Sequence, residues 1–390
     1  MRIVYFILLS VLTLHSCGDV KRGDLMDISV EISRNVTLLL SEITEEITSI
    51  ELELTDKSII NPDDIRKVHF SDSLIFIAEM YKMLVFDMEG KFIRSIGSRG
   101  QGPGEYIFIQ GFTFDEKNKI IYIINNYRQI IGYDLNGNFV KEFSLRDMVI
   151  SGRNRGQILG IDYFDNELLL LAENIIGQQG KKHVIRSVLY KINNEMQFID
   201  SCFVRDDYLE IIPSKGMLYD YATYSNTAVY LYYPEISSFI INNNPDLYNR
   251  LGTVERVLRD TLYRFENNRL VPELKLNFKR NGRDYNGDKN VELYNIHRSS
   301  RYIFVIYTTV LDRNSRFLFC YDTETGIGYN SLKYRDEFNN IEEEVRGNSL
   351  RRPIRPVSNN TELFYYWHTH MKPDDMNEPN PTLYIGRLKK

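Results

Sequence analysis

Acid–base chemistry needs carboxylates that the fold brings within reach of one another, and four aspartates are candidates. They are Asp162, Asp165, Asp206 and Asp207. Two of them could act as general acid and base on a polysaccharide, and the distance between their carboxyl groups would decide the outcome. Their positions along the chain leave that distance open. The sequence has no G-x-S-x-G nucleophile elbow, no Walker loop and no H-E-x-x-H motif, so no other reaction is indicated.

Two patterns resemble metal sites without completing one. His368 and His370 place two imidazoles on one face of a strand, a spacing compatible with zinc or copper, but no third ligand can be identified among the six histidines. The run that begins at Asp284 resembles a calcium loop. Its sixth and twelfth positions require glycine and glutamate, and they hold Lys289 and Asn295. We therefore expect an exposed turn there, no metal site and no cofactor.

A glycine-rich loop, residues 97–106, follows a strand-like run and carries Arg99, Gln101 and Glu105. Its four glycines and one proline take the chain out of a sheet and into a compact connection. The backbone amides of the loop and Arg99 could bind an anion or a sugar hydroxyl. Alternatively, Glu105 accepts hydrogen bonds from the loop amides and only holds the connection together, which is the reading that we favour.

Aromatic residues supply the other candidate binding surface. Trp367 lies beside two tyrosines and could stack on a sugar, although aromatic side chains in a strand also fill the space between sheets. Tyr221 and Tyr224 belong to a tyrosine-dense run that suits carbohydrate or protein recognition. Half-buried packing explains that run equally well.

The amino terminus has the form of a secretory signal. Arg2 precedes an apolar run over residues 3–14, which is too short to span a bilayer, and Leu-His-Ser-Cys follows. This ending resembles the bacterial lipobox, in which the cysteine becomes the lipidated first residue. We expect residues 1–16 to be the signal peptide, Cys17 to carry the lipid, and 17–47 to form a tether and leader. An ordinary signal peptide with an incidental cysteine is the alternative.

Composition bears on the kind of partner, on the secondary structure and on the state of the cysteines. The formal charge of −5 over 390 residues gives no reason to expect nucleic acid as a partner. Abundant tyrosine and phenylalanine favour strands. Cys202 and Cys320 each lie inside a strand-like run, so we expect buried free thiols, although an exported protein could pair them.

Six units of strand, strand, turn and strand recur along the chain. Their turns are marked by short polar pairs: Glu89-Gly90, Asn136-Gly137, Asn193-Asn194, Asn267-Asn268 and Thr325-Gly326. Radial repetition of small antiparallel sheets is typical of a β-propeller. We therefore predict an all-β fold over 48–390, a six-bladed β-propeller of four-stranded antiparallel blades. Residues 48–54 alternate strictly, and we expect this N-terminal strand to close the ring, a free edge strand being the alternative.

Two insertions look helical. Residues 245–258 carry an apolar stripe at helical spacing after a proline, and residues 336–345 are acidic and weakly amphipathic. We expect both to cap the ring.

These motifs resemble a known family. The matching stretches are Phe86-Asp87-x-x-Gly90-Lys91-Phe92, the loop at 100–106, Asp260-Thr261-Leu262-Tyr263-Arg264 and Asn380-Pro381-x-Leu383. From about Leu40 to its end, the chain is similar to the six-bladed β-propeller lipoproteins of Bacteroides-type bacteria, which are relatives in shape of the NHL-repeat propellers. The resemblance implies an envelope-attached propeller and no particular reaction.

Together these features predict a lipid-anchored protein of the cell envelope, held in the outer membrane on a face that the sequence leaves open. We expect it to act as a binding or scaffold propeller for an envelope protein or an extracellular glycan. The alternative is a polysaccharide lyase or hydrolase with its site in the central funnel of the ring.

Overall fold

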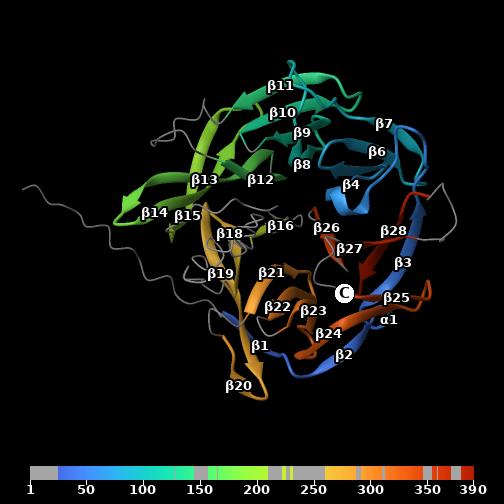
Figure 1. Ribbon diagram of the computed structural model, residues 1–390, viewed down its shortest axis with the longest axis vertical. Helices are drawn as coiled ribbons and strands as arrows, with labels where there is room; N and C mark the ends of the chain where they lie inside the picture. Colours follow the sequence, from blue (N-terminus) through green and yellow to red (C-terminus); the bar gives the residue numbers. More distant parts are fainter. Residues whose placement is uncertain are drawn as a thin grey trace, which may run out of the picture.

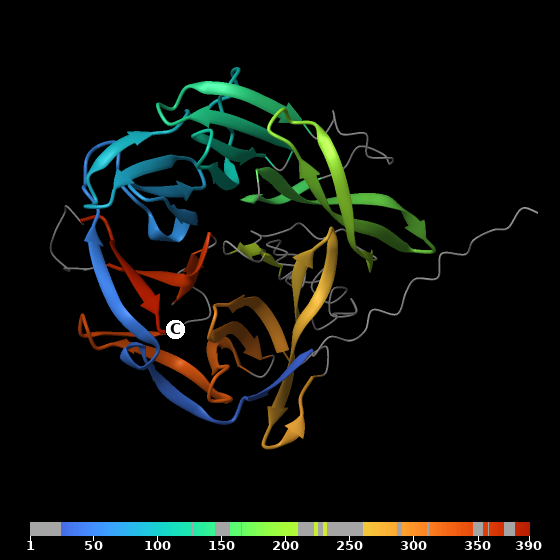
Figure 2. The same ribbon diagram turned by 180° about the vertical axis from the view of Figure 1, so that it is seen from behind.

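Six antiparallel sheets stand as blades around a ring in the computed structural model, which Figure 1 shows from one side and Figure 2 from behind. The structure describes residues 25–126, 128–144, 157–164, 166–209, 222–224, 229–231, 260–286, 291–309, 312–345, 354–357, 359–369 and 379–390. The protein is a six-bladed β-propeller, and the predicted fold class is confirmed.

The first three blades follow one another along the chain, each with four strands. Blade 1 contains β4 (Ile65–Phe70), β5 (Leu74–Glu79), β6 (Met83–Asp87) and β7 (Phe92–Ser95). Blade 2 contains β8 (Ile109–Asp115), β9 (Ile120–Asn125), β10 (Gln129–Asp134) and β11 (Phe139–Ser144). Blade 3 contains β12 (Gln157–Phe164), β13 (Glu167–Gln179), β14 (Lys182–Ile192) and β15 (Phe198–Leu209).

The last three blades are completed by strands from the amino terminus. Blade 4 contains β16 (Ala222–Tyr224), β17 (Val229–Leu231), β18 (Thr261–Glu266), β19 (Arg269–Arg280) and the short β20 (Arg283–Asp284). Blade 5 contains β21 (Val291–Arg298), β22 (Tyr302–Thr309), β23 (Asp312–Asp322), β24 (Ile327–Asp336) and β25 (Ile341–Glu344). Blade 6 contains β26 (Arg355–Val357), β27 (Asn360–His368) and β28 (Thr382–Leu388).

The recurring Asp-x-x-Gly motif forms the turn between the two outer strands of a blade. In blade 1, Oδ1 of Asp87 accepts hydrogen bonds from the amides of Glu89 and Lys91 at 3.1 and 2.8 Å. Gly90 follows with φ of +86°, a conformation that other residues rarely adopt. Asp134 and Gly137 repeat this arrangement in blade 2. The motif therefore marks the outer hairpin of these blades.

The amino-terminal segment runs along the outside of the ring (Figure 1). β1 (Met26–Glu31) lies parallel to β19, and β2 (Asn35–Leu39) lies parallel to β24. After the one-turn helix α1 (Leu40–Ile43), β3 (Thr44–Glu51) pairs antiparallel with β28 and is the fourth strand of blade 6. Closure of the ring by an N-terminal strand is thus confirmed, although the strand spans Thr44–Glu51 and not the predicted residues 48–54. β1 and β2 also belong to the blades, although they precede residue 48, where we expected the propeller to begin.

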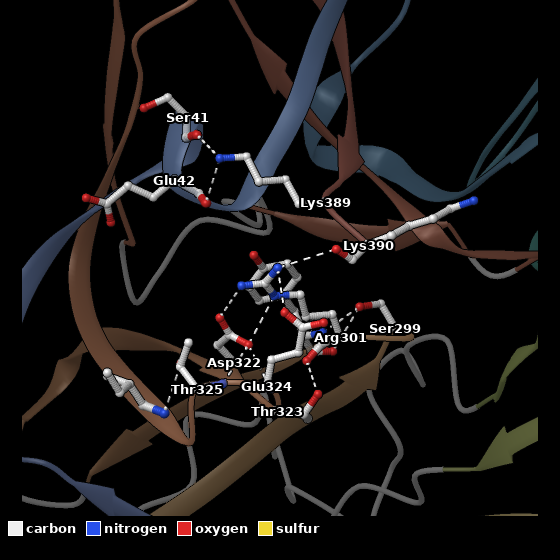
Figure 3. A network of polar contacts seen from close by, with 12 residues as sticks. Ser41, Glu42, Ser299, Arg301, Asp322, Thr323, Glu324, Thr325, Lys389 and Lys390 are labelled. Carbon is white, nitrogen blue, oxygen red and sulfur yellow. Dashed lines mark hydrogen bonds and ion pairs between the residues drawn. The ribbon is translucent and has the colours of Figure 1, made fainter.

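The last residues of the chain fasten this closure, as Figure 3 shows. Nζ of Lys389 donates hydrogen bonds to the carbonyl oxygens of Ser41 and Glu42 at 2.8 and 3.0 Å. Nearby, the guanidinium of Arg301 binds Asp322 through two hydrogen bonds of 3.1 and 2.7 Å and also reaches the carbonyl oxygen of Lys390 at 3.4 Å. The carboxyl end of the chain is therefore tied to α1 and to blade 5.

The hydrophobic core lies between neighbouring blades rather than at the centre of the ring. Between blades 6 and 1, for example, Ile77 and Phe86 pack in one buried cluster with Tyr365 and Leu383. Alternating apolar residues of each strand supply one face to each neighbouring seam. Among the described residues, no helix has the length and apolar character needed to cross a membrane.

One of the two expected helices is a hairpin. Residues 336–345 include β25, which pairs antiparallel with β24 through ion pairs such as Arg335–Glu342 at 2.6 Å. Asn340 has a φ of +55° in the turn, and Asp336 accepts a hydrogen bond from the amide of Phe338. The acidic residues thus face cations across two strands rather than along a helix. The other expected helix, residues 245–258, lies outside the described residues.

Candidate functional site

The glycine-rich loop uses its polar groups internally. Glu105 accepts a hydrogen bond from the amide of Gly102 at 2.8 Å, and the amide of Gly100 donates to the carbonyl oxygen of Tyr106. The guanidinium of Arg99 lies over the ring of Tyr81, 4.1 Å from its centre. Gln101 is exposed. These contacts fit the role of a connector between blades 1 and 2.

Trp367 is part of the packing between blades. Its ring meets Tyr365 edge to face at 6.1 Å, within the cluster that joins blades 6 and 1. Tyr221 lies outside the described residues, and of Tyr224 only the backbone, in β16, is described. Trp367 is half-buried, and its described ring contact is with another aromatic side chain of this seam.

The described residues among the candidate metal ligands and thiols contact other protein groups or are buried. His368 forms a 2.9 Å contact with Glu343, and His370 lies outside the described residues. In the part of the chain that the structure describes, no three histidine, cysteine, aspartate or glutamate side chains are placed so that they could hold a metal ion. Asp284 accepts a hydrogen bond from the amide of Asn286 in an exposed turn. Cys202 and Cys320 are buried free thiols in β15 and β23.

The candidate acid–base carboxylates are divided between two strands of blade 3. Asp162 lies on the inner strand β12, whereas Asp206 and Asp207 lie on the outer strand β15. Each contacts a cation: Asp162 contacts Lys67 at 2.8 Å, Asp206 contacts Arg186 at 2.7 Å, and Asp207 contacts Arg205 at 2.9 Å. Asp165 lies outside the described residues.

The Lys67–Asp162 pair joins the inner strands of blades 1 and 3. Its side chains are only 7% and 3% exposed. Lys67 Nζ also lies 6.0 Å from the ring centre of Phe112 in blade 2. Close by, burial and then the charge of Lys67 lower the pKa of His69 to about 3, so this imidazole is neutral. This ion pair therefore links three consecutive blades at the inner side of the ring.

A second buried carboxyl group lies in blade 3, on β13. Burial raises the pKa of Glu173 to about 8, against the opposing effect of Arg205. Its carboxyl group accepts a hydrogen bond from the hydroxyl of Ser187 at 3.3 Å. Glu173 thus retains its proton at neutral pH and acts as a packed polar group within the blade.

A cavity of about 440 Å³ lies between blades 6 and 1, at the end of the ring that carries the turns between first and second strands. We call it the seam groove. Three lining residues come from β3, four from β27 and β28, and the others from blade 1 and from turns of blades 2 and 6. It is lined by Glu46, Thr48, Ile50, Phe70, Ser71, Asp72, Met88, Glu116, Asn359, Asn360, Leu363, Ile385 and Arg387.

The floor of the seam groove is apolar, and a hydrogen bond from a side-chain amide joins its two sides. Ile50 and Phe70 belong to the buried cluster between the blades, and Leu363 and Ile385 pack against it. Nδ2 of Asn359 donates to the carbonyl oxygen of Phe70 at 2.7 Å and so links the turn of blade 6 to the end of β4. This bond fixes the two sides of the groove relative to one another.

The rim of the seam groove is mainly acidic. Glu46 pairs with Arg387 across β3 and β28 at 3.2 Å, and both side chains are largely exposed. Asp72 and Glu116 lie in the first turns of blades 1 and 2 and are exposed. Within the described residues they form no ion pair. The groove therefore offers an apolar surface beside uncompensated negative charge.

None of the residues predicted from sequence to bind a ligand lines this groove. Its residues lie in turns and strands up to 341 positions apart, as Glu46 and Arg387 show. One sequence feature did bear on the location of the groove. The predicted pairing of residues 48–54 with the last blade brings the two ends of the chain together beside blade 1.

Fold and groove together define a six-bladed β-propeller with a ligand-sized groove between its first and last blades. The chain belongs to the family described as a domain of unknown function, DUF4934, whose model matches residues 25–382. A search of the curated proteins gives no match.

Several solved structures align with this chain. A protein of Bacteroides fragilis that is named a "putative exported protein" aligns with a TM-score of 0.61 and 14% identity, over 94% of this chain and 100% of that chain. BamB from Moraxella catarrhalis has a TM-score of 0.41 and 7% identity over 87% and 100% of the two chains. The Pan2 WD40 domain of Neurospora crassa has values of 0.42 and 10% over 92% and 89%. At 14% identity the likeness to the Bacteroides fragilis protein concerns the fold alone.

Proposed function

We propose that this protein is a lipid-anchored binding or scaffold protein of the cell envelope, and that its ligand occupies the seam groove. The observation that carries the proposal is the groove itself, a 440 Å³ cavity with an apolar floor and a polar rim on a ring of rigid blades. The lipobox-like ending at Cys17 supports export and anchoring in the outer membrane. The exported relative in fold from Bacteroides fragilis is consistent with that location.

Binding is favoured over catalysis by how the carboxylates are used. The two-carboxylate arrangement of a polysaccharide hydrolase needs an acid and a base facing one substrate bond. Asp162, Asp206 and Asp207 instead each contact a cation. Nothing in the described residues thus supports the alternative of a lyase or hydrolase in the central funnel.

The test compares two tryptophan substitutions on β3. Thr48 lines the groove, and its neighbour Ser49 is exposed on the other face of the strand, because successive side chains alternate. The native protein and each variant are isolated from the envelope in mild detergent, and co-purifying proteins and glycans are identified. We expect Thr48→Trp to lose the ligand and Ser49→Trp to keep it. Retention of every ligand by Thr48→Trp would contradict the proposal.

A further inference from the structure

We propose that the seam groove binds an extended basic peptide segment of a partner protein, with an aliphatic side chain on the floor and flanking lysine or arginine residues at the rim. This inference rests on the proposed function, because it names the ligand class of the same groove. Three features of the described residues carry it: the kind of apolar surface, the charge of the rim and the open strand beside it.

The apolar surface suits an aliphatic side chain better than a sugar ring. Sugar recognition commonly uses an exposed aromatic face, and Phe70, the one aromatic residue among those that line the groove, is only 8% exposed. Ile50, Leu363 and Ile385 supply aliphatic contact instead. Met88 at the rim is 36% exposed, and its flexible thioether can adapt to a protein side chain.

The rim favours a cation. Three carboxylates, those of Glu46, Asp72 and Glu116, face the groove against the single guanidinium of Arg387. Glu46 and Arg387 satisfy one another. Lys117 follows Glu116 directly but reaches across to Asn166 of blade 3 at 3.4 Å, so it does not neutralise the rim. The remaining negative charge attracts positively charged ligands.

The strand beside the groove favours an extended peptide. β3 is the outermost strand of blade 6, and no described strand pairs with its outer edge. In blades 4 and 5 the corresponding strands, β19 and β24, each carry a further strand, β1 or β2. The ring therefore already accepts extended segments at its outer edges, and a peptide chain can supply the same backbone hydrogen bonds where a glycan cannot.

The experiment measures fluorescence anisotropy with three probes on the full-length protein. These are the fluorescein-labelled hexapeptide Gly-Lys-Leu-Leu-Lys-Gly, its counterpart with glutamate in place of lysine, and labelled maltohexaose. We expect the basic peptide alone to bind, and to bind more weakly as sodium chloride rises from about 0.05 to 0.5 M. Asp72→Asn and Glu116→Gln should each weaken it about two- to fivefold, the range for exposed ion pairs.

The matched control is Glu195→Gln, which removes the same charge from an exposed turn of blade 3 outside the groove and should leave affinity unchanged. Equal binding of the basic and acidic peptides, or affinity that ignores Asp72 and Glu116, would overturn the basic-peptide assignment. If maltohexaose binds and Thr48→Trp abolishes that binding, the groove is a binding site and only its ligand class is wrong. If Thr48→Trp leaves the native ligand bound, the site itself is wrong.

Discussion

The buried ion pair between Lys67 and Asp162 gives a large and specific prediction about stability. Replacing Lys67 by methionine keeps most of the volume of the side chain and leaves Asp162, 3% exposed, with no opposite charge from Lys67. Breaking such a pair by removing one partner costs about 3–5 kcal/mol. Total stabilities of about 5–15 kcal/mol are usual, so we expect Lys67→Met to remove a substantial part of the free energy of unfolding.

The double variant distinguishes this reasoning from a general effect of mutating the core. In Lys67→Met with Asp162→Leu both charges of this pair are removed, and replacement of buried pairs by apolar residues is often neutral or stabilising by about 1–4 kcal/mol. The double variant should therefore be more stable than Lys67→Met alone. The exposed pair Glu46–Arg387, with side chains 64% and 49% exposed, is the control, and its removal should cost about 0–1 kcal/mol.

Chemical denaturation followed by tyrosine and tryptophan fluorescence measures these differences, together with a thermal midpoint for each variant. A loss below about 1 kcal/mol in Lys67→Met would refute the view that the pair anchors the inner strands. A double variant as unstable as the single one would show that the cost comes from altered packing rather than from charge.

Three further outcomes follow from other features. Gly90→Ala should destabilise the protein by about 2–5 kcal/mol, because the new Cβ would lie 2.1 Å from the carbonyl oxygen of Glu51. Gly180→Ala, also at positive φ but with open space around it, should cost only about 1–2 kcal/mol. Equal shifts of the denaturation midpoint in the two variants would contradict this prediction. Glu173 has a pKa of about 8 in the folded protein and near 4.5 in the unfolded chain, so its contribution to stability declines as pH rises from 4.5 to 8, by up to about 1.4 kcal/mol per pH unit. Glu173→Gln should therefore flatten the plot of unfolding free energy against pH. An unchanged slope would rule out Glu173 as the source of this pH dependence. Cys17→Ser should abolish incorporation of an alkyne-bearing fatty acid in growing cells, and persistent labelling would exclude Cys17 as the lipid site.

The blades could be predicted because their information is local. Asp87 and Gly90 lie three residues apart, and their hydrogen bonds and φ value form within that one turn. Alternating apolar residues on either side then define the strands. The same reasoning extended to ring closure, since residues 48–54 alternate but have no hairpin partner nearby.

The groove and the outer strands could not be predicted in this way. β1 and β2 pair in parallel with β19 and β24, hundreds of residues later in the chain, and no local turn signals such a partnership. The groove depends on where those distant pairings place side chains such as Asp72 and Arg387. The 336–345 hairpin was missed because acidic residues at nearly helical spacing also suit cross-strand pairs with Arg335 and Lys333.

The circumferential path of β1, β2 and β3 has a consequence for how the protein reaches its native state. These strands are synthesised before every blade, whereas their partners β19, β24 and β28 all lie in the last third of the chain. β1, β2 and β3 therefore cannot form their native pairs until the strands of blades 4–6 have been synthesised, and contacts of such long sequence separation form slowly. Closure of the ring thus comes last, because blade 6 is complete only when β28 pairs with β3.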